Sequence, residues 1–572
     1  MIPKFEILEL ETKLHNFTLK VNGYFLHSKY DPEKEAKQFI DKNYKPNHIT
    51  ILFGYGKGYF AKALMDRKEK KDKVIVIEPL KIPKVEEIEK SIDYVYIQDT
   101  NEEAIQSLLI EELNIYSNIN IICSPNYNNL FPELYLELLT MIKERVSINR
   151  IMENTMRRYA SDWQKNYIFN LGNAFIDQSL SNLYKKYSCP VVIVSGGPSL
   201  TKQIEQLRLV LDKVIIIAAG STINTLLNFN IVPDYVISID GGVPNYNHFK
   251  GLFFKDSKLI YSMYNHHQIR ESFNNPSFYF LSADASNLSS HMKSVLKTDF
   301  PIITGGGSVA NYALAVGLYI THGPITFIGQ DLAYTDKKTH AEHNKSFSIV
   351  DDAYIKKRDL FLARGYSGED VLTDYAFYTM KEDFEGMIKS NGLQGLIFNS
   401  TEGGIFLDGF TQIPFKEFCT TYIDQNYIKN IEINSVEIPQ KTSVKLFIDQ
   451  IKEEVKTYDK IKILLNDSLS ALIKNKKNVS FSKDVLKKID KNDVKLDKLY
   501  KIVPLSSILA PITMDVMKKY SPKADETDME KFNRVYEQNT TLYKRLLEVT
   551  NTTQQYTTDL IKQLQEKLEM SE

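Results

Sequence analysis

Three glycines and a serine, Gly305, Gly306, Gly307 and Ser308, form a candidate ligand-binding turn. They precede a stretch of small residues that predicts a helix from Ser308 to about Tyr319. Glycine lets the backbone approach a ligand where a Cβ would collide, and the free N–H groups of a helix start favour an anion. A phosphate or carboxylate is therefore the expected ligand, although a tight turn before a packed helix would explain the same glycines.

A polar pair follows the next predicted strand, residues 325–328. The chain runs from Thr304 and the glycines into the predicted helix and then into this strand. Gly329 follows the strand, and Gln330 and Asp331 come next. Ligands in open α/β sheets bind at the carboxyl ends of strands. The glycine turn and the polar pair are therefore expected to face one crevice.

Three earlier predicted strands also end in glycine or polar residues. The wholly apolar run after Pro190 is typical of a strand buried on both faces of a parallel sheet. The residues that follow these strands are Ser195, Gly196, Gly197, Pro198 and Ser199 after the first, Gly220 and Ser221 after the second, and Asp240 after the third. Because the carboxyl ends of parallel strands meet at one edge, a single shared crevice is the simplest account.

The first part of the chain carries a separate glycine turn, Gly54-x-Gly56-x-Gly58. It lies within a βαβ pattern at residues 49–77 that is closed by Glu78, an acid placed where a ribose hydroxyl could bind. The glycine spacing is closer to that of methyltransferase-like Rossmann domains than to the dinucleotide fingerprint, and no catalytic motif accompanies it. We favour a Rossmann-like scaffold, with a bound nucleotide-type cofactor as the alternative.

Composition bounds the class of protein. The 572 residues are too many for one core and suggest about three or four domains. With 43% hydrophobic residues, 25% charged residues and a net charge of −1, nothing indicates nucleic-acid binding. The three cysteines, Cys123, Cys189 and Cys419, lie far apart, which fits a reducing cytoplasm. The start of the chain does not resemble a signal peptide, and no apolar run reaches the roughly 18 residues of a membrane span.

The order of these patterns predicts an α/β protein in four parts. We expect a Rossmann-like N-terminal domain at 1–147, a helical connector at 148–187, a central α/β domain with a mostly parallel sheet at 188–425, and a helical C-terminal domain at 426–572. The long, charge-rich segments of the last part have apolar residues at i, i+3 and i+4, which predicts a bundle of three or more helices. Their apolar stripes are expected to pack internally; docking of a partner protein is the alternative.

The central part of the chain resembles the Maf (motility-associated factor) flagellin glycosyltransferases. The motifs that carry the resemblance are SGGPSL, AAGSTINTLL, PDYVISIDGG, TGGGSVANYAL and FIGQDLAYTDKKTH, within roughly residues 185–420. It implies transfer of a nonulosonic acid, such as pseudaminic or legionaminic acid, from a CMP-activated donor to Ser or Thr of flagellin, a step needed for flagellum assembly and motility. Flagellin would then be the partner protein, and the C-terminal bundle a reasonable place for it to bind.

The Maf central domain is in turn similar to bacterial sialyltransferases, which implies where the donor binds. The matching positions are 196–200, 304–307 and 399–400. The residues expected to bind the donor are Ser195, Gly196, Gly197, Pro198, Ser199, Gly220, Ser221, Asp240, Thr304, Gly305, Gly306, Gly307, Ser308, Gln330, Asn399 and Ser400. Sialyltransferases have an asparagine in the first loop where this chain has only Ser195-Gly196-Gly197, so an amide that would hold substrate is missing there.

The charge of such a donor indicates the mechanism. The anomeric carbon leaves CMP through an oxocarbenium-like transition state, so backbone N–H groups must hold a departing phosphate while a base takes the acceptor's proton. His340, Asp331 and Glu402 are the candidate bases, and a general base typically accelerates such a step by about 10²- to 10⁴-fold. His343 is a further histidine of the same loop, and residues 402–415 are expected to close the crevice.

No obligatory metal or other cofactor is expected, because a monophosphate-linked donor carries less charge to neutralise than a diphosphate-linked one. Two other functions stay open. The same glycine motifs resemble archaeal-type pterin pyrophosphokinases, which transfer diphosphate from ATP with Mg²⁺, and a degenerate site would leave a non-catalytic flagellin-binding escort protein. The residues do not specify the nonulosonic acid, the accepting Ser or Thr, or the oligomeric state.

Overall fold

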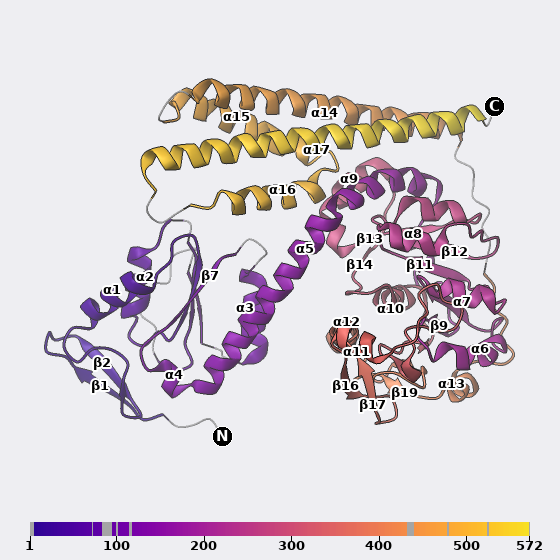
Figure 1. Ribbon diagram of the computed structural model, residues 1–572, viewed down its shortest axis with the longest axis horizontal. Coiled ribbons are helices and arrows are strands. Elements are labelled where there is room, and N and C mark those ends of the chain that lie inside the picture. Colours follow the sequence, from indigo (N-terminus) through magenta and orange to yellow (C-terminus); the bar gives the residue numbers. More distant parts are fainter. Residues whose placement is uncertain are drawn as a thin grey trace. The chain divides into compact units, whose positions relative to one another are not determined.

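Two parallel β-sheets organise the part of the chain that the computed structural model describes (Figure 1). That part comprises residues 5–70, 72–82, 94–98, 101–113, 117–431, 440–476, 480–522 and 526–570. The chain divides into a smaller unit, Met1–Arg158 with Pro522–Thr527, and a larger unit, Tyr159–Ser521 with Asp528–Glu572. The predicted α/β class is confirmed.

The smaller unit is built on a parallel sheet with the strand order β6-β5-β4-β7. The strands are β4 (Ile49–Phe53), β5 (Val74–Ile77), β6 (Tyr94–Ile97) and β7 (Ile119–Cys123), and the helices are α1 (Pro32–Asn43), α2 (Tyr59–Arg67), α3 (Glu102–Glu112) and α4 (Tyr127–Leu130). A separate antiparallel sheet contains β1 (Ile7–Glu11), β2 (Phe17–Val21) and β3 (Tyr24–Phe25). The predicted Rossmann-like arrangement of strands and helices is present.

The glycine turn of the smaller unit is filled by the chain's own side chains. The fully buried carboxylate of Glu78 accepts hydrogen bonds from the backbone N–H groups of Tyr55 (2.6 Å) and Gly56 (2.9 Å). It also accepts from the Leu80 N–H (2.6 Å) and from the Tyr127 hydroxyl (2.6 Å). Burial raises the pKa of Glu78, and these hydrogen bonds oppose that shift. The acid therefore binds the turn itself rather than a ribose, which supports the scaffold interpretation.

Replacing Glu78 by glutamine is expected to loosen this turn. Both carboxylate oxygens of Glu78 accept from N–H donors, so the amide group of a glutamine must face at least one of them. Leaving a buried donor unpaired costs about 1–3 kcal/mol. Hydrogen exchange of the Tyr55 and Gly56 amides should become faster in Glu78→Gln and stay unchanged in the exposed control Glu111→Gln. Equal exchange in both variants would contradict this role of Glu78.

The larger unit contains the second parallel sheet. Its strands are β8 (Gln178–Ser179), β9 (Val191–Val194), β10 (Ile215–Ala219), β11 (Tyr235–Ser238), β12 (Lys258–Ser262), β13 (Phe278–Ser282), β14 (Ile302–Ile303), β15 (Ile325–Ile328), β18 (Ile397–Asn399) and β19 (Thr411–Gln412). They follow the order β14-β13-β12-β11-β10-β9-β15-β18-β19, with β8 beside β13. The described pairings in this sheet are parallel, as predicted for the central domain.

The strand order of this sheet reverses beside β9. Strands β10 to β14 are added in sequence on one side of β9, whereas β15, β18 and β19 are added on the other. In open α/β sheets, ligands bind outside the carboxyl ends of the strands at such a switch point. The topology therefore places the candidate site beyond the ends of β9, β10 and β15.

Helices and one antiparallel hairpin surround this sheet. The helices are α6 (Leu200–Arg208), α7 (Thr222–Asn228), α8 (Val243–Phe249), α9 (Ser289–Leu296), α10 (Val309–Ile320), α11 (Asp352–Arg358), α12 (Tyr375–Ser390) and α13 (Phe415–Tyr422), and the hairpin is β16 (Phe361–Arg364) with β17 (Asp370–Thr373). Helix α10 agrees with its prediction, and the Ser308 hydroxyl caps it by accepting a hydrogen bond from the Asn311 N–H (3.2 Å).

Long helices form the C-terminal part of the larger unit. They are α14 (Lys441–Asn475), α15 (Lys483–Tyr500), α16 (Ser506–Lys519) and α17 (Asp528–Met570). Helices α14 and α17 run side by side (Figure 1). Their apolar residues, among them Tyr458, Leu465 and Leu546, form a buried core of their own. The predicted bundle is thus present, and much of its apolar stripe packs internally.

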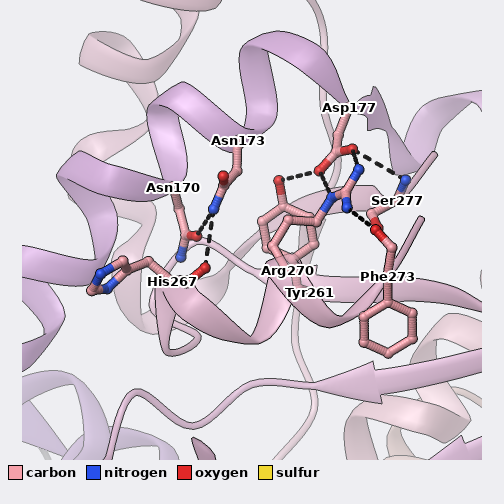
Figure 2. Close-up of polar contacts among 8 residues, drawn as sticks. All are labelled: Asn170, Asn173, Asp177, Tyr261, His267, Arg270, Phe273 and Ser277. Atoms are coloured by element: carbon pink, nitrogen blue, oxygen red, sulfur yellow. Dashed lines mark hydrogen bonds and ion pairs between the residues drawn. The ribbon is translucent and has the colours of Figure 1, made fainter. Parts of the chain in front are cut away.

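Helix α5 (Pro132–Ile176) ends earlier than the helical connector that was predicted at 148–187. The next residue, Asp177, accepts hydrogen bonds from the Nε and Nη2 atoms of Arg270 (both 2.7 Å) and from the Tyr261 hydroxyl (3.0 Å) (Figure 2). It also accepts from the Ser277 N–H (3.2 Å). These hydrogen bonds hold Asp177 at the point where the helix ends and β8 begins. Strand β8 then pairs with β13.

Candidate functional site

A cavity of about 290 Å³ lies at the switch point of the larger sheet. Its size is near the lower end of the range of roughly 300–1,000 Å³ that is usual for small-molecule sites. Its lining comes from four strand ends, the start of α10, a loop and α12. The lining residues are Ser195, Gly196, Gly197 and Pro198 after β9; Ala219, Ser221 and Thr222 at the end of β10; Asp240 after β11; Gly307, Ser308, Val309 and Ala310; Gly329, Gln330, Asp331, Leu332 and Ala333 after β15; Thr339 and His340; and Phe377 and Met380.

The structure brings together many of the residues predicted for donor binding or catalysis, because their strand ends share one edge. The predicted residues outside the lining are Ser199, Gly220, Thr304, Gly305, Gly306, Asn399, Ser400 and Glu402. Asn399 is buried and donates to Gln412 Oε1 (2.7 Å), and the buried Ser400 hydroxyl accepts from Thr326 (2.8 Å). Glu402 accepts a hydrogen bond from the Phe415 N–H (3.0 Å). Segment 402–415, which we expected to close the crevice, contributes no lining residue.

Asp331 organises the first glycine loop. Its carboxylate is buried and accepts hydrogen bonds from the Ser199 hydroxyl (2.6 Å) and the Ser199 N–H (3.2 Å). Burial raises the pKa of Asp331, and the bonds from Ser199 oppose that shift. A Cβ on Gly197 would lie only 2.1 Å from Asp331 Oδ2 and 2.6 Å from the Gly329 carbonyl oxygen. The geometry thus gives Asp331 the role of positioning the loop, with little of its carboxylate left to act as a base.

The glycine turn before α10 also binds a carboxylate of this chain. The Gly307 N–H donates to Asp383 Oδ2 (2.7 Å), and Asp383 belongs to α12. An internal carboxylate therefore occupies the position at which the sequence predicted a bound anion. The turns at Gly56, Ser199 and Gly307 share this feature, because each donates at least one backbone hydrogen bond to a carboxylate of the same chain.

The imidazole of His340 lies beside the first glycine loop. Burial lowers the pKa of His340, a contact with the Ser346 backbone opposes this, and nearby His248 lowers it further. The loop is held in place because the Ala341 N–H donates to the Gly196 carbonyl oxygen (2.9 Å). His343 is exposed and lies edge-on to the ring of Phe229, with centroids 5.4 Å apart, outside the cavity lining.

Four polar atoms of the lining lack a hydrogen-bond partner in the described part of the chain, although they are buried. They are Ser195 Oγ, Thr222 Oγ1, Gln330 Oε1 and His340 Nδ1. A buried polar group without a partner costs about 1–3 kcal/mol, so folded proteins contain few of them. Several such atoms around one cavity are available to bond a polar ligand.

The cavity lining contains no lysine or arginine. The polar contacts to a ligand must therefore come from hydroxyl, amide and imidazole groups, from backbone N–H groups and from the two carboxylates of the lining. The same cavity also has apolar lining residues, which we call the apolar wall: Leu332, Phe377 and Met380. Such a mixture suits a ligand with one polar and one aromatic or apolar part.

Some lining residues were not predicted from the sequence. Thr222, Thr339, Phe377 and Met380 were missed. Thr222 lies within the AAGSTINTLL motif and could have been included with Gly220 and Ser221. Phe377 and Met380 are three residues apart on α12 and so share a helix face, but no local pattern connects that face with the glycine turns.

The chain is similar to one family model over part of its length and to a solved structure over its whole length. A family model described as "6-hydroxymethylpterin diphosphokinase MptE-like" matches residues 165–337. No curated protein matches the chain. Among solved structures, that of the MAf glycosyltransferase from Magnetospirillum magneticum AMB-1 is similar with a TM-score of 0.64 and 13% sequence identity, covering 100% of this chain and 96% of that one.

This chain has the Maf glycosyltransferase fold. The likeness extends over both units, so the Rossmann-like part, the central sheet and the helical bundle all belong to the shared architecture. The match to the MptE-like model falls within the central sheet of the Maf fold, from α5 to the segment after β15.

Two further observations concern this Maf-fold chain. None of its described helices is both long enough and apolar enough to cross a membrane. Among the described residues, no group of three or more histidine, cysteine, aspartate or glutamate side chains is placed to hold a metal ion. The expectation that the protein needs no metal stays a prediction.

Proposed function

We propose that the protein is a glycosyltransferase that moves a nonulosonic acid of the pseudaminic or legionaminic type from a CMP-activated donor to Ser or Thr of flagellin. One observation carries the proposal: a cavity at the sheet's switch point is lined by four buried polar atoms without partners. The Maf glycosyltransferase fold of the full chain and the central motifs support the choice of chemistry.

The lining suggests how the donor binds. Ser195 and Thr222 hydroxyls can donate to the phosphate of CMP, and the Gln330 side chain can bond a hydroxyl or amide of the ligand. The apolar wall formed by Leu332, Phe377 and Met380 suits the cytosine base. A donor held in this way keeps its phosphate away from bulk water, where each hydrogen bond to the departing CMP stabilises the transition state more strongly.

Replacing Thr222 by valine is expected to weaken CMP binding about 10- to 100-fold. A hydrogen bond to a charged group is worth about 1.5–3 kcal/mol, and valine keeps the shape of threonine without its hydroxyl. Thr225→Val is the matched control, because the Thr225 hydroxyl is also buried without a partner but lies outside the cavity lining. Isothermal titration with CMP in the absence of Mg²⁺ measures both variants. Equal affinities would argue against phosphate binding at Thr222.

The transfer reaction itself is tested with purified flagellin. Incubation with the protein and a CMP-nonulosonic acid should raise the mass of flagellin by one sugar per modified Ser or Thr. Flagellin from a strain that lacks the gene should in turn be lighter than flagellin from the parent strain. An unchanged flagellin mass in the deletion strain would remove the glycosyltransferase proposal.

A second candidate function is diphosphate transfer to a pterin, which the MptE-like match over residues 165–337 favours. Thermal-shift measurements separate the two. Stabilisation by CMP without Mg²⁺ supports the glycosyltransferase, whereas stabilisation only by ATP with Mg²⁺ supports the diphosphokinase. A chain that responds to neither nucleotide would fit a non-catalytic escort protein.

A further inference from the structure

The cavity lining contains two carboxylates in different settings. Asp331 is buried and bonded to Ser199, as described above. The side chain of Asp240 is exposed to the solvent of the cavity, and in the described part of the chain its carboxylate has no hydrogen bond or ion pair. Asp240 is therefore the free acidic group of this site.

The main chain at Asp240 is held firmly although the side chain is free. Its carbonyl oxygen accepts hydrogen bonds from the His266 N–H (3.1 Å) and from Asn245 Nδ2 (2.8 Å). Asn245 also donates to the buried Ser238 hydroxyl (2.9 Å), which in turn donates to Asn265 Oδ1 (2.7 Å). This network fixes the position from which the carboxylate extends into the cavity.

Asp240 lies at the opposite end of the site from Leu332. Phe377 is on the side of Leu332, because its ring packs against Tyr334 in the segment after β15. Asp240 follows β11, whereas Leu332 follows β15, and β10 and β9 lie between these strands. At about 4.8 Å per strand, three steps separate the two strand ends by about 14 Å. The unpartnered atoms of Thr222 and Ser195 follow β10 and β9, between these two ends, and that of Gln330 follows β15 itself.

This arrangement orients a nucleotide-linked sugar acid. The base belongs at the apolar end and the phosphate among the unpartnered polar atoms, so the sugar points toward β11. A carboxylate at that end repels the carboxylate of the sugar and cannot hold it. It can accept a proton, and desolvation by the surrounding protein raises the pKa of Asp240.

We propose that Asp240 is the general base that takes the proton of the acceptor hydroxyl, an assignment that rests on the proposed glycosyltransferase function. The acceptor oxygen forms a bond to the anomeric carbon while the bond from that carbon to the CMP phosphate oxygen breaks. CMP leaves with the electron pair of that bond, and the hydroxyl proton moves to the Asp240 carboxylate.

The other two acidic candidates are less suited to this step. The Asp331 carboxylate already accepts hydrogen bonds from Ser199, and Glu402 lies outside the cavity lining. His340 lies on a loop held against Gly196, and its neighbour His248 belongs to α8, which follows Asp240.

The test compares Asp240→Asn, Asp240→Ala and the control Asp284→Asn, whose exposed carboxylate lies outside the cavity lining. Transfer to flagellin and CMP binding are measured for each. Asp240→Asn should lower kcat by about 10²- to 10⁴-fold and leave the Kd for CMP within about twofold, as expected for a base that does not bind the nucleotide. Added formate should restore Asp240→Ala by at least about tenfold and leave Asp284→Asn unaffected.

The outcomes separate the two proposals. If the wild-type protein transfers the sugar and Asp240→Asn is equally active, the assignment of the base is wrong while the glycosyltransferase function stands. The same holds if formate restores no activity to Asp240→Ala although that variant binds CMP normally. If the wild-type protein transfers no sugar, the proposed function fails and the role of Asp240 fails with it.

Discussion

Replacing Arg270 by methionine is expected to lower the free energy of unfolding of the larger unit by about 3–5 kcal/mol. The Asp177 side chain is 0% exposed and that of Arg270 is 15% exposed, and two charge-assisted hydrogen bonds of 2.7 Å join them (Figure 2). Without Arg270, the Asp177 carboxylate stays buried with only the Tyr261 hydroxyl and the Ser277 N–H as partners. A buried charge that loses its counter-ion accounts for most of the loss.

The double variant Arg270→Met/Asp177→Leu is the control for this prediction. It removes both charges, so it should recover at least about half of the lost stability, while Tyr261 and Ser277 still lack an acceptor. Urea unfolding can be followed by the fluorescence of Trp163, the only tryptophan of the chain, which stacks on Tyr264 within the larger unit. A loss below about 1 kcal/mol in Arg270→Met would show that this pair is not important for the end of α5.

Replacing Gly197 by alanine is expected to abolish most activity, with a loss of at least about 100-fold. The new Cβ would lie 2.1 Å from Asp331 Oδ2 and 2.6 Å from the Gly329 carbonyl oxygen, so the backbone or Asp331 must move. Overpacking of this kind costs about 1–3 kcal/mol. A displacement of about 1 Å in a catalytic site is enough for a 10²-fold effect.

Gly386→Ala is the matched control for Gly197→Ala. Gly386 lies in α12, and a Cβ there meets no atom within 4 Å. Alanine in a helix is also more favourable than glycine, so this variant should keep full activity and equal or higher stability. Transfer assays and CMP titration test both variants. Full CMP affinity in Gly197→Ala would contradict the view that Asp331 and Gly197 shape the donor site.

Local patterns were sufficient to predict the strands and their common edge. The strand predicted at 325–328 has the bounds of β15, and the apolar run predicted as a buried strand after Pro190 contains β9. Parallel strands present their carboxyl ends on one side, so Ser195, Asp240 and Gln330 could be expected around one crevice before their distances were known. The donor-binding and catalytic roles of these residues stay predictions.

The partners of the glycine turns depend on contacts between distant parts of the chain. Asp331 accepts a hydrogen bond from Ser199, which lies 132 residues away in the sequence. Asp383 accepts one from Gly307, which lies 76 residues away. A glycine turn looks the same in sequence whether an external anion or an internal carboxylate satisfies its N–H groups. For this reason the sequence suggested an anion at Gly307, where the structure has Asp383.

The sequence by itself determined the α/β class, the parallel strands, the helical C-terminal part and the residues at the strand ends, because these follow from local periodicity and chain direction. Only the tertiary structure decided which of those residues face the cavity. Packing of α12 brought Phe377 and Met380 to the cavity and Asp383 to the glycine turn, and packing around Asp331 left Asp240 as the free carboxylate. Such long-range packing fixes which polar groups are already bonded and which stay available for a ligand.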